Sequence, residues 1–360
     1  MKALVTGATG FIGGALAAGL VEAGWSVNVL VRASSRQRLA NAQRFHLVEA
    51  DLGEETADLR PALEGCDVVF DAAAIRDRWG TSREGYRRTN AEGTRRLLQA
   101  ACGRARRFVY VSSVGVLGFP GVQGIDESFP VATHSTKVDY HSTKAEAEQV
   151  VLAHGERLET LVVRPTITYG PGDADGMLTR LIDLIARGRF VRVGHGGNHF
   201  HLTYIDDLVR GLILAGTHES APGKTFILAG PASIAVREMI GLIDRALGLP
   251  PHRFYLPETP ARALAWGVEC LYRAGSALGV PSLKGSPPIT RDKIDILCRH
   301  RGFSSARAAG VLGYSPRVSY PEGLARTLAW MTETGRLPGA LLGRPTDTNL
   351  QYAFPGRPGT

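Results

Sequence analysis

Residues 2–14 read KALVTGATGFIGG, and this stretch decides the fold. Residues 2–6 form a short apolar run, which is too brief for a helix and suits a buried parallel strand. Gly7, Gly10 and Gly13 follow at three-residue spacing, and residues 15–20 read as a helix. A strand, a glycine-rich turn and a helix in this order are typical of the first unit of a dinucleotide-binding sheet.

Each glycine of this turn has a physical reason. Gly7 permits the tight turn, Gly10 lets backbone amides approach a pyrophosphate, and Gly13 lets the helix pack on the strand. The N-terminus of the helix supplies N–H donors and a positive dipole end for the phosphates. A glycine-rich turn can also exist without a ligand, but its placement between a strand and a helix favours a bound cofactor.

The composition is that of an ordinary globular chain. Its 360 residues can bury a large core in one or two domains, with 44% hydrophobic and 21% charged residues. The net charge is +8, but the arginines are dispersed and form no basic stripe interleaved with aromatic residues, so no nucleic-acid partner is expected. The charge fits an anionic cofactor, and also an acidic substrate or a membrane surface, but a solvated basic surface is favoured as its explanation.

Cysteine usage and the start of the chain bear on localisation. The cysteines at 66, 102, 270 and 298 form no CxxC pair, which argues against a zinc site or a disulfide framework and suits a reducing cytoplasm. The first strand begins at residue 2, so no signal peptide is expected, and no uncharged run reaches the ~18 apolar residues of a membrane span. We expect a cytoplasmic protein without a bound metal.

The end of the second strand, residues 26–31, indicates which cofactor is preferred. In NAD-selective members of this architecture an acidic residue there holds the ribose 2′-hydroxyl. Here Val31 ends the strand, and Arg32 and Arg36 flank two serines. These groups attract a 2′-phosphate that a carboxylate would repel, so NADP is favoured, with NAD left open. The alternative is that Arg36 and Arg38 are only surface charges.

Later segments continue the alternation of strands and helices. Further strands are expected at residues 45–52, 66–74 and 107–113, with a helix over 94–101. The third strand brings Asp51 to a position where it could meet an adenine, and small residues at the end of the fourth leave room for a cofactor. The fold class is therefore predicted as α/β, a Rossmann-type doubly wound parallel sheet.

Tyr140 and Lys144 are the candidate catalytic pair. Their i, i+4 spacing puts both on one face of a helix, where an ammonium group lowers the ordinary tyrosine pKa of about 10. Such a pair can exchange a proton with a substrate hydroxyl or carbonyl, while the hydroxyl of Ser113 holds the same oxygen. YxxxK is common by chance, but here it follows a glycine turn and a fifth strand that ends in two serines.

Motifs in order over residues 1–335 resemble the extended short-chain dehydrogenase/reductases, of the epimerase/dehydratase superfamily. They are TGATGFIGG, the DAAA end of strand four, NAEGT, YVSSVGVLG, YHSTK and VRPTITYGPGD. The resemblance makes Tyr140 the acid/base, Lys144 the residue that lowers its pKa and holds ribose, and Ser113 the residue that orients the reacting oxygen. Ser113 is chosen over Ser112 because the family's hydroxyl stands five residues before a glycine, here Gly118.

The resemblance also implies a set of cofactor-binding residues. They are Gly7, Gly10, Phe11, Ile12, Gly13, Arg32, Asp51, Leu52, Ala72, Ala73, Asn90, Tyr140, Lys144, Pro165 and Ile167.

At two positions this chain differs from the motifs of the sugar-modifying members of the superfamily, and these differences indicate which branch it resembles. Sugar dehydratases carry an Asp-Glu pair after the hydroxyl residue, where this chain has Val114 and Gly115. Nucleotide-sugar epimerases have an asparagine at Ile167, whose apolar side chain cannot make the same hydrogen bonds. RPTITYGPGD, AAxxxxWG (residues 73–80), TYIDDL (203–208) and PEGLARTLAW (321–330) are instead similar to the 3β-hydroxysteroid dehydrogenase branch.

That branch implies an NAD(P)-dependent oxidoreductase that interconverts a secondary alcohol and a ketone. Its substrate is expected to be a small apolar molecule of the sterol, terpenoid or long-chain 3-oxo acid type. Two alternatives stay open. One is a nucleotide-sugar epimerase with tightly bound NAD, and the other is a non-catalytic dinucleotide-binding regulator, against which the intact Ser113, Tyr140 and Lys144 argue.

The C-terminal half is expected to hold the substrate. Residues 1–170 form the cofactor domain, to which 203–229 return, and residues 171–202 and 230–335 form the smaller α/β domain. Residues 336–360 are rich in glycine and proline and read as a loose tail.

Two further features of this half leave alternatives open. His195, His199 and His201 fit ordinary loop histidines better than metal ligands. Residues 261–278 form an amphipathic helix with apolar residues at Leu264, Val268, Leu271, Gly275 and Leu278. It could lie on a membrane, cover an apolar substrate or pack as an ordinary helix, and a homodimer is also left open.

Overall fold

A parallel sheet forms the centre of the molecule in the computed structural model. The structure describes residues 1–75, 81–118, 120–132, 139–278, 280, 283 and 287–338. Within these residues the sheet has seven strands in the order β11-β6-β5-β4-β1-β2-β3. The strands are β1 (Lys2–Thr6), β2 (Ser26–Val31), β3 (His46–Glu49), β4 (Val68–Asp71), β5 (Arg107–Val111), β6 (Glu159–Pro165) and β11 (Thr225–Leu228).

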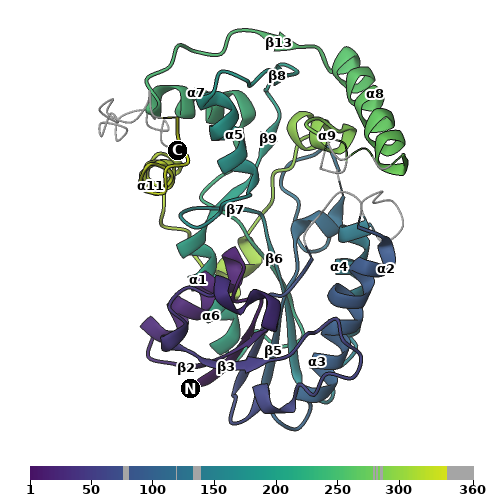
Figure 1. The fold of residues 1–360 in the computed structure, drawn as a ribbon. Coiled ribbons are helices and arrows are strands. Elements are labelled where there is room, and N and C mark those ends of the chain that lie inside the picture. Colours follow the sequence, from purple (N-terminus) through teal and green to yellow (C-terminus); the bar gives the residue numbers. More distant parts are fainter. Residues whose placement is uncertain are drawn as a thin grey trace.

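Helices cover both faces of this sheet (Figure 1). α1 (Phe11–Glu22) and α6 (Ile205–Thr217) lie on one face, and α3 (Thr94–Ala101) and α4 (Asp139–Leu152) lie on the other. The strand residues alternate accordingly, since Val5 faces the first pair of helices and Leu4 the second, and both are 0% exposed. The predicted Rossmann-type doubly wound sheet is therefore confirmed.

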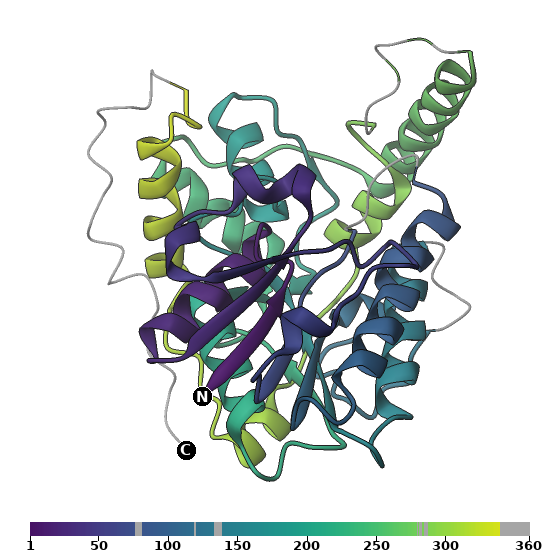
Figure 2. The same cartoon turned by 60° about the horizontal axis from the view of Figure 1, so that its bottom comes forward.

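Short elements connect the strands. They are the 3₁₀-helices η1 (Ala33–Arg38), η2 (Ala42–Arg44), η3 (Arg60–Leu63) and η5 (Val114–Leu117), the helix α2 (Arg83–Arg87) and the π-helical turn η4 (Arg88–Gly93). Figure 2 brings the purple N-terminal strands to the front, and the green helix of residues 258–277 stands at the upper right, clear of the sheet.

The carboxyl-terminal half is built from two-stranded pairs and helices. β7 (Ile167–Tyr169) pairs with β10 (Leu202–Tyr204), β8 (Arg192–Val193) with β13 (Tyr255–Leu256), and β9 (His199–Phe200) with β12 (Ile234–Ala235). The helices are α5 (Met177–Ala186), α7 (Val236–Ala246), α8 (Glu258–Ala277), α9 (Arg291–Cys298), α10 (Ala306–Leu312) and α11 (Tyr320–Glu333).

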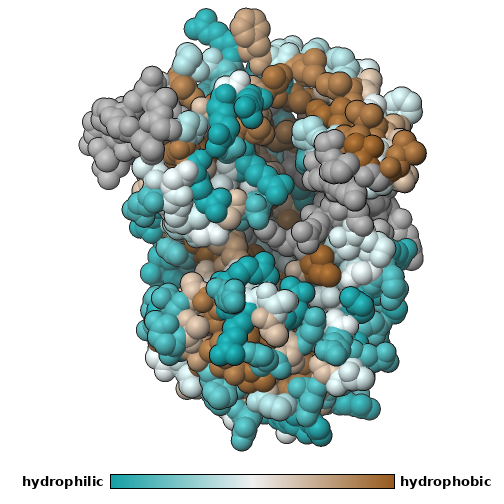
Figure 3. Space-filling view, viewed as in Figure 1, coloured by the Kyte–Doolittle hydropathy of each residue, from teal (hydrophilic) through white to brown (hydrophobic). Residues whose placement is uncertain are grey.

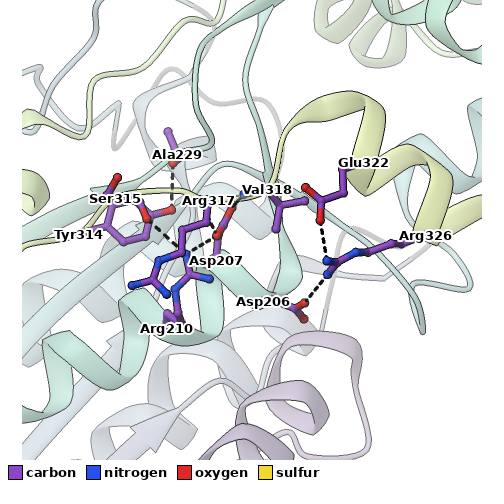
Figure 4. Close-up of polar contacts among 10 residues, drawn as sticks. All are labelled: Asp206, Asp207, Arg210, Ala229, Tyr314, Ser315, Arg317, Val318, Glu322 and Arg326. Carbon is purple, nitrogen blue, oxygen red and sulfur yellow. Dashed lines mark hydrogen bonds and ion pairs between the residues drawn. The ribbon is translucent and has the colours of Figure 1, made fainter. Parts of the chain in front are cut away.

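Two acids at the start of α6 join the halves (Figure 4). Asp207 is 0% exposed and accepts hydrogen bonds from the backbone N–H groups of Arg317 (2.9 Å) and Val318 (3.1 Å). Asp206 forms an ion pair with Arg326 of α11 at 3.3 Å. These contacts fix the segment between α10 and α11 against α6, so the acids have a structural role here.

The third and fourth strands are shorter than the sequence predicted. β3 ends at Glu49 because the Asp51 carboxylate accepts the Gly53 N–H (2.8 Å) and turns the chain. β4 ends at Asp71 because the following backbone bends toward the glycine turn, where the N–H of Ala73 donates to the Thr6 hydroxyl (3.0 Å).

The helix predicted over 261–278 forms as α8, but its large apolar residues do not pack. Its buried positions are Ala261, Ala265, Glu269 and Gly275. Leu264, Trp266, Leu271 and Leu278 are 55%, 58%, 58% and 82% exposed. Figure 3 shows the corresponding hydrophobic patch at the upper right of the molecule. α8 therefore packs through its small residues and Glu269 against α9, while these larger apolar side chains stay exposed. Residues 339–360 of the predicted tail, and Trp79 and Gly80, lie outside the described residues.

Candidate active site

The glycine turn forms a cradle that side chains would fill. Gly7 has φ +71°, and a Cβ there would stand 2.8 Å from the carbonyl oxygen of Ala72. A Cβ on Gly13 would stand 2.4 Å from the carbonyl oxygen of Gly7. Gly7 therefore permits the backbone conformation of the turn, and Gly13 permits the helix to approach the strand closely.

The first turn of α1 is suited to an anion. Gly10 is the N-cap and has no side chain to cap the helix, and the first turn carries no acidic residue. Phe11, Ile12 and Gly13 form that turn, so their backbone N–H groups lie at the positive end of the helix dipole. Together with the small Ala72 and Ala73 beside Gly7, this arrangement fits the pyrophosphate of a dinucleotide.

The end of β2 differs from the sequence prediction in one respect. Arg32 follows the strand and is exposed, as expected for a residue that could reach a ligand. Arg36 forms an ion pair with Glu49 at 2.6 Å, and Glu49 lies directly opposite Val31 in the β2–β3 register. A carboxylate is thus present beside the end of β2. It comes from the neighbouring strand, which is why a search of residues 26–36 alone missed it.

The remaining residues predicted for the adenine side lie near β3. The Asp51 carboxylate accepts the Gly53 N–H, and Leu52 is 6% exposed with its carbonyl oxygen close to Gly93. Both residues follow β3 and lie at the same carboxyl edge of the sheet as the glycine turn.

Lys144 is buried behind the start of α4. It is 2% exposed, its Nζ donates to the carbonyl oxygen of Val111 at 2.8 Å, and it lies 4.5 Å from the Tyr110 ring centroid. Burial lowers the Lys144 pKa to about 8, while Asp71 and Glu148 act in the opposite direction. Tyr140, one helical turn earlier, is partly exposed, so the phenol can meet a substrate while the ammonium stays inside.

Ser113 is held in place next to this helix. It follows β5 and is the N-cap of η5, where its Oγ accepts the Gly115 N–H at 3.0 Å. Gly115 in turn lies against His141, because a Cβ on Gly115 would stand 2.4 Å from the His141 Nε2. The loop that carries Ser113 and the helix that carries Tyr140 are therefore in contact.

His141 is a residue of the site that sequence reasoning missed. Its ring lies 5.4 Å from that of Tyr140, between centroids. Burial lowers its pKa to about 4, with a smaller contribution from the charge of Arg301, so the imidazole is neutral near pH 7. Its position next to Tyr140 in YHSTK was the available signal.

Asn90 links the segment after β4 to α4. It is 0% exposed, its Oδ1 accepts the Ile75 N–H (2.8 Å), and its Nδ2 donates to the Thr143 hydroxyl (3.4 Å). Thr143 precedes Lys144 on α4, so this amide holds that part of the helix against the segment after β4.

Pro165 and Ile167 mark the passage from the sheet to the second half. Pro165 ends β6, and Ile167 begins β7 opposite Leu202. Ile167 is partly buried and packs against the main core, which agrees with an apolar wall at the position where epimerases have an amide.

The three histidines predicted as loop residues have separate contacts. His195 packs on Tyr255 with ring centroids 4.6 Å apart, His199 is stacked near His300, and the Nε2 of buried His201 lies 3.1 Å from the Gly230 carbonyl oxygen. In the described part of the chain, no group of three potential metal ligands occurs.

Comparison with known proteins identifies the class. Residues 3–229 match the NAD dependent epimerase/dehydratase family. The chain belongs to this family, and it is an NAD(P)-dependent oxidoreductase of the extended short-chain dehydrogenase/reductase type, as the motifs predicted.

Several of its curated relatives are reductases and dehydrogenases of this family. It is 34% identical to 4-hydroxy-2-methyl-3-oxo-4-farnesyl-3,4-dihydroquinoline-1-oxide ketoreductase of Stigmatella aurantiaca, over 90% of this chain and 95% of that protein. It is 32% identical to 2-alkyl-3-oxoalkanoate reductase of Stenotrophomonas maltophilia, over 91% and 99%. A 3 beta-hydroxysteroid dehydrogenase/Delta 5-->4-isomerase of Mycobacterium tuberculosis is 28% identical over 91% and 90%. The predicted resemblance to the 3β-hydroxysteroid dehydrogenase branch is confirmed.

Solved structures agree on the fold. The crystal structure of gox2253 has a TM-score of 0.77 and 29% identity, and covers 94% of this chain and 99% of that one. UDP-glucuronic acid 4-epimerase from Bacillus cereus, in complex with NAD, has a TM-score of 0.72 at 22% identity, covering 93% and 99%. The epimerase likeness shows the fold alone.

Proposed function

We propose that this protein is an NADP-dependent ketone reductase or alcohol dehydrogenase for an apolar substrate, with Ser113, Tyr140 and Lys144 as its catalytic residues. The observation that carries the proposal is the placement of Lys144. Its ammonium is buried at the end of β5, one helical turn from a partly exposed tyrosine and next to the loop of Ser113. The names of the ketoreductase and 3-oxoalkanoate reductase relatives support the reaction class.

The proposed roles follow from the electrostatics. The nicotinamide, when bound, supplies or accepts the hydride. The Lys144 ammonium favours the phenolate of Tyr140, so its hydroxyl can donate a proton to a ketone or take one from an alcohol near neutral pH. The Ser113 hydroxyl orients the same substrate oxygen. Neutral His141 packs on the Ser113 loop and adds no charge that would compete with Lys144.

NADP is the proposed cofactor rather than NAD. Val31 offers no carboxylate to the ribose hydroxyls, and the exposed Arg32 follows it. Arg36 is also within reach of this strand end, although its pairing with Glu49 means that a 2′-phosphate must compete with that carboxylate. An exposed ion pair contributes only about 0–1 kcal/mol, so the competition is weak.

We also propose that the cofactor and the substrate bind to different domains. Residues 1–170 with 203–229 hold the cofactor, and residues 171–202 and 230–335 hold the substrate. The names of the relatives give a farnesylated quinoline oxide, a 2-alkyl-3-oxoalkanoate and a 3 beta-hydroxysteroid as their substrates. We therefore propose a substrate of the sterol, terpenoid or long-chain 3-oxo acid type.

An activity screen tests the reaction class. With stoichiometric NADPH, we expect net oxidation of the cofactor, followed at 340 nm, on 3-oxo acids, steroid ketones or terpenoid ketones. Nucleotide sugars should give no net change. Conversion of a UDP-sugar to its epimer without net cofactor turnover would instead establish the epimerase alternative, and cofactor binding without any turnover would establish the regulator.

The exposed face of α8 is proposed to contact an anionic membrane surface. Within the described residues no helix is long and apolar enough to cross a membrane, so any contact through α8 would be peripheral. Trp266 and Leu271 are exposed on α8, and the preceding loop exposes Phe254 (90%). Arg253 and Arg273 are exposed beside them, and the chain carries a net charge of +8. Apolar and aromatic residues next to arginines are typical of helices that lie in a lipid interface.

Vesicle sedimentation checks this proposal. Wild type is expected to pellet with vesicles of phosphatidylglycerol and phosphatidylcholine more than with phosphatidylcholine alone, and the variant L264S/L271S/L278S should lose most of that binding. A control with serine at Val122 and Leu184, which are exposed elsewhere, should retain it. Absence of vesicle binding by wild type contradicts the proposal. If the triple variant instead changes from dimer to monomer, the face is a homodimer interface.

A further inference from the structure

Four charged side chains are buried between α4 and the sheet. Asp71, Lys144, Glu148 and Arg164 are 0%, 2%, 2% and 4% exposed. Glu148 and Arg164 satisfy each other, because the guanidinium donates from Nε (3.0 Å) and Nη2 (2.7 Å) to the two carboxylate oxygens. Two of the four charged groups are outside this ion pair, the carboxylate of Asp71 and the ammonium of Lys144.

Asp71 is held by neutral donors. The Thr6 hydroxyl donates to its Oδ1 at 2.6 Å, and the Thr94 hydroxyl donates to its Oδ2 at 2.7 Å. Burial raises the pKa of Asp71, while Thr6 and then Lys144 act to lower it. The backbone of Ala73 adds a further neutral hydrogen bond. Because a buried carboxylate is costly without a compensating charge, neutral donors alone are a poor environment for the anion.

Lys144 lies over the same strand ends as this carboxylate. Its Nζ is 4.5 Å from the Tyr110 ring centroid, and Tyr110 is the direct partner of Asp71 in the β4–β5 register. Besides the Val111 carbonyl oxygen and the Tyr110 ring, the charged groups that act on Lys144 are Asp71 on β4 and Glu148 on its own helix. Arg164 on β6 is paired with Glu148, and Tyr140 precedes Lys144 by one helical turn. Asp71 is the largest favourable charge among them.

We propose that Asp71 is the counter-ion of Lys144, a positioning residue that keeps the ammonium charged in a site that excludes water. The inference rests on the proposed catalytic role of Lys144 for its functional meaning. Glu148 is paired with Arg164, so its charge is shared, and Asp71 is the larger of the two favourable charges that act on the lysine. A neutral Lys144 would no longer favour the phenolate of Tyr140.

The test measures the titration of Lys144 directly in the protein without cofactor. Lysine occurs only at positions 2, 137, 144, 224, 284 and 293, so ¹³C-labelled lysine gives few Cε signals, and K144R assigns the one of interest. The wild-type midpoint is expected near the pKa of about 8. In D71N it should fall by about 1 unit or more, because the opposite charge is removed. D71S provides the same measurement if D71N does not fold.

T94V is the matched control. It removes one hydroxyl that holds Asp71 but leaves the carboxylate, so the Lys144 midpoint should stay close to wild type. An unchanged midpoint in D71N, or an equal fall in T94V, would overturn the counter-ion role.

The alkaline limb of the pH–kcat profile for ketone reduction should move to lower pH in D71N along with the midpoint. If the midpoint falls but the profile does not follow, Asp71 is still the counter-ion, and the proposed catalytic role of Lys144 is what fails.

Discussion

Replacing Tyr140 by phenylalanine is expected to lower kcat about 10²- to 10⁴-fold, the range usually contributed by a positioned general acid or base. The aromatic ring and its packing near His141 remain, since only the hydroxyl is removed. Cofactor affinity should therefore change little, because Lys144 and the glycine turn are untouched. Steady-state kinetics with a ketone substrate, together with NADPH titration by fluorescence, measures the two effects separately.

The equivalent change at an exposed tyrosine provides the control. Tyr255 is 39% exposed on β13, so Y255F should retain wild-type kcat. If Y140F turns over at nearly the wild-type rate, Tyr140 is not the proton carrier. A parallel loss of cofactor affinity and kcat in Y140F would show that the variant damages the site as a whole.

Removal of the Arg32 guanidinium is expected to weaken NADP binding about ten- to a hundredfold and to leave NAD binding nearly unchanged. A charge-assisted hydrogen bond contributes roughly 1.5–3 kcal/mol, and about 1.4 kcal/mol corresponds to a factor of ten in Kd. V31D should shift the preference further, because its carboxylate repels the 2′-phosphate and offers a partner to the ribose hydroxyls. Calorimetric titration of both cofactors against wild type, R32A and V31D gives the comparison.

R60A is the control for loss of positive charge. Arg60 is exposed and paired with Asp58 at 2.8 Å, so its removal should change neither affinity. Two results would contradict the prediction: equal affinity of the wild-type protein for NAD and NADP, or an equal loss of both affinities in R32A. Either result would show that Arg32 is a surface residue or an adenine contact. The NADP proposal would then fail, while the oxidoreductase assignment, which rests on the family, would stand.

Local sequence was sufficient to predict the fold and to propose the residue types of the candidate site. The alternation of apolar strands with helices predicted the parallel sheet, because buried parallel strands read as short apolar runs. The spacing of Gly7, Gly10 and Gly13 predicted the cradle. Gly7 and Gly13 exclude a Cβ through close backbone contacts, and a Cβ on Gly10 would stand 3.2 Å from the carbonyl oxygen of Gly7. The spacing of Tyr140 and Lys144 placed both on one helix.

Contacts between segments far apart in the chain were decided only by the tertiary structure. Glu49 lies beside Val31, and Asp71 shares a cluster with Lys144, because parallel strands bring their carboxyl ends to one edge whatever their separation in sequence. His141 became neutral through packing on Gly115, which no periodicity reveals. The outward direction of Leu264 and Leu271 on α8 was also undetermined by sequence. An amphipathic pattern specifies that one face is apolar, but only the neighbouring elements determine whether that face is covered.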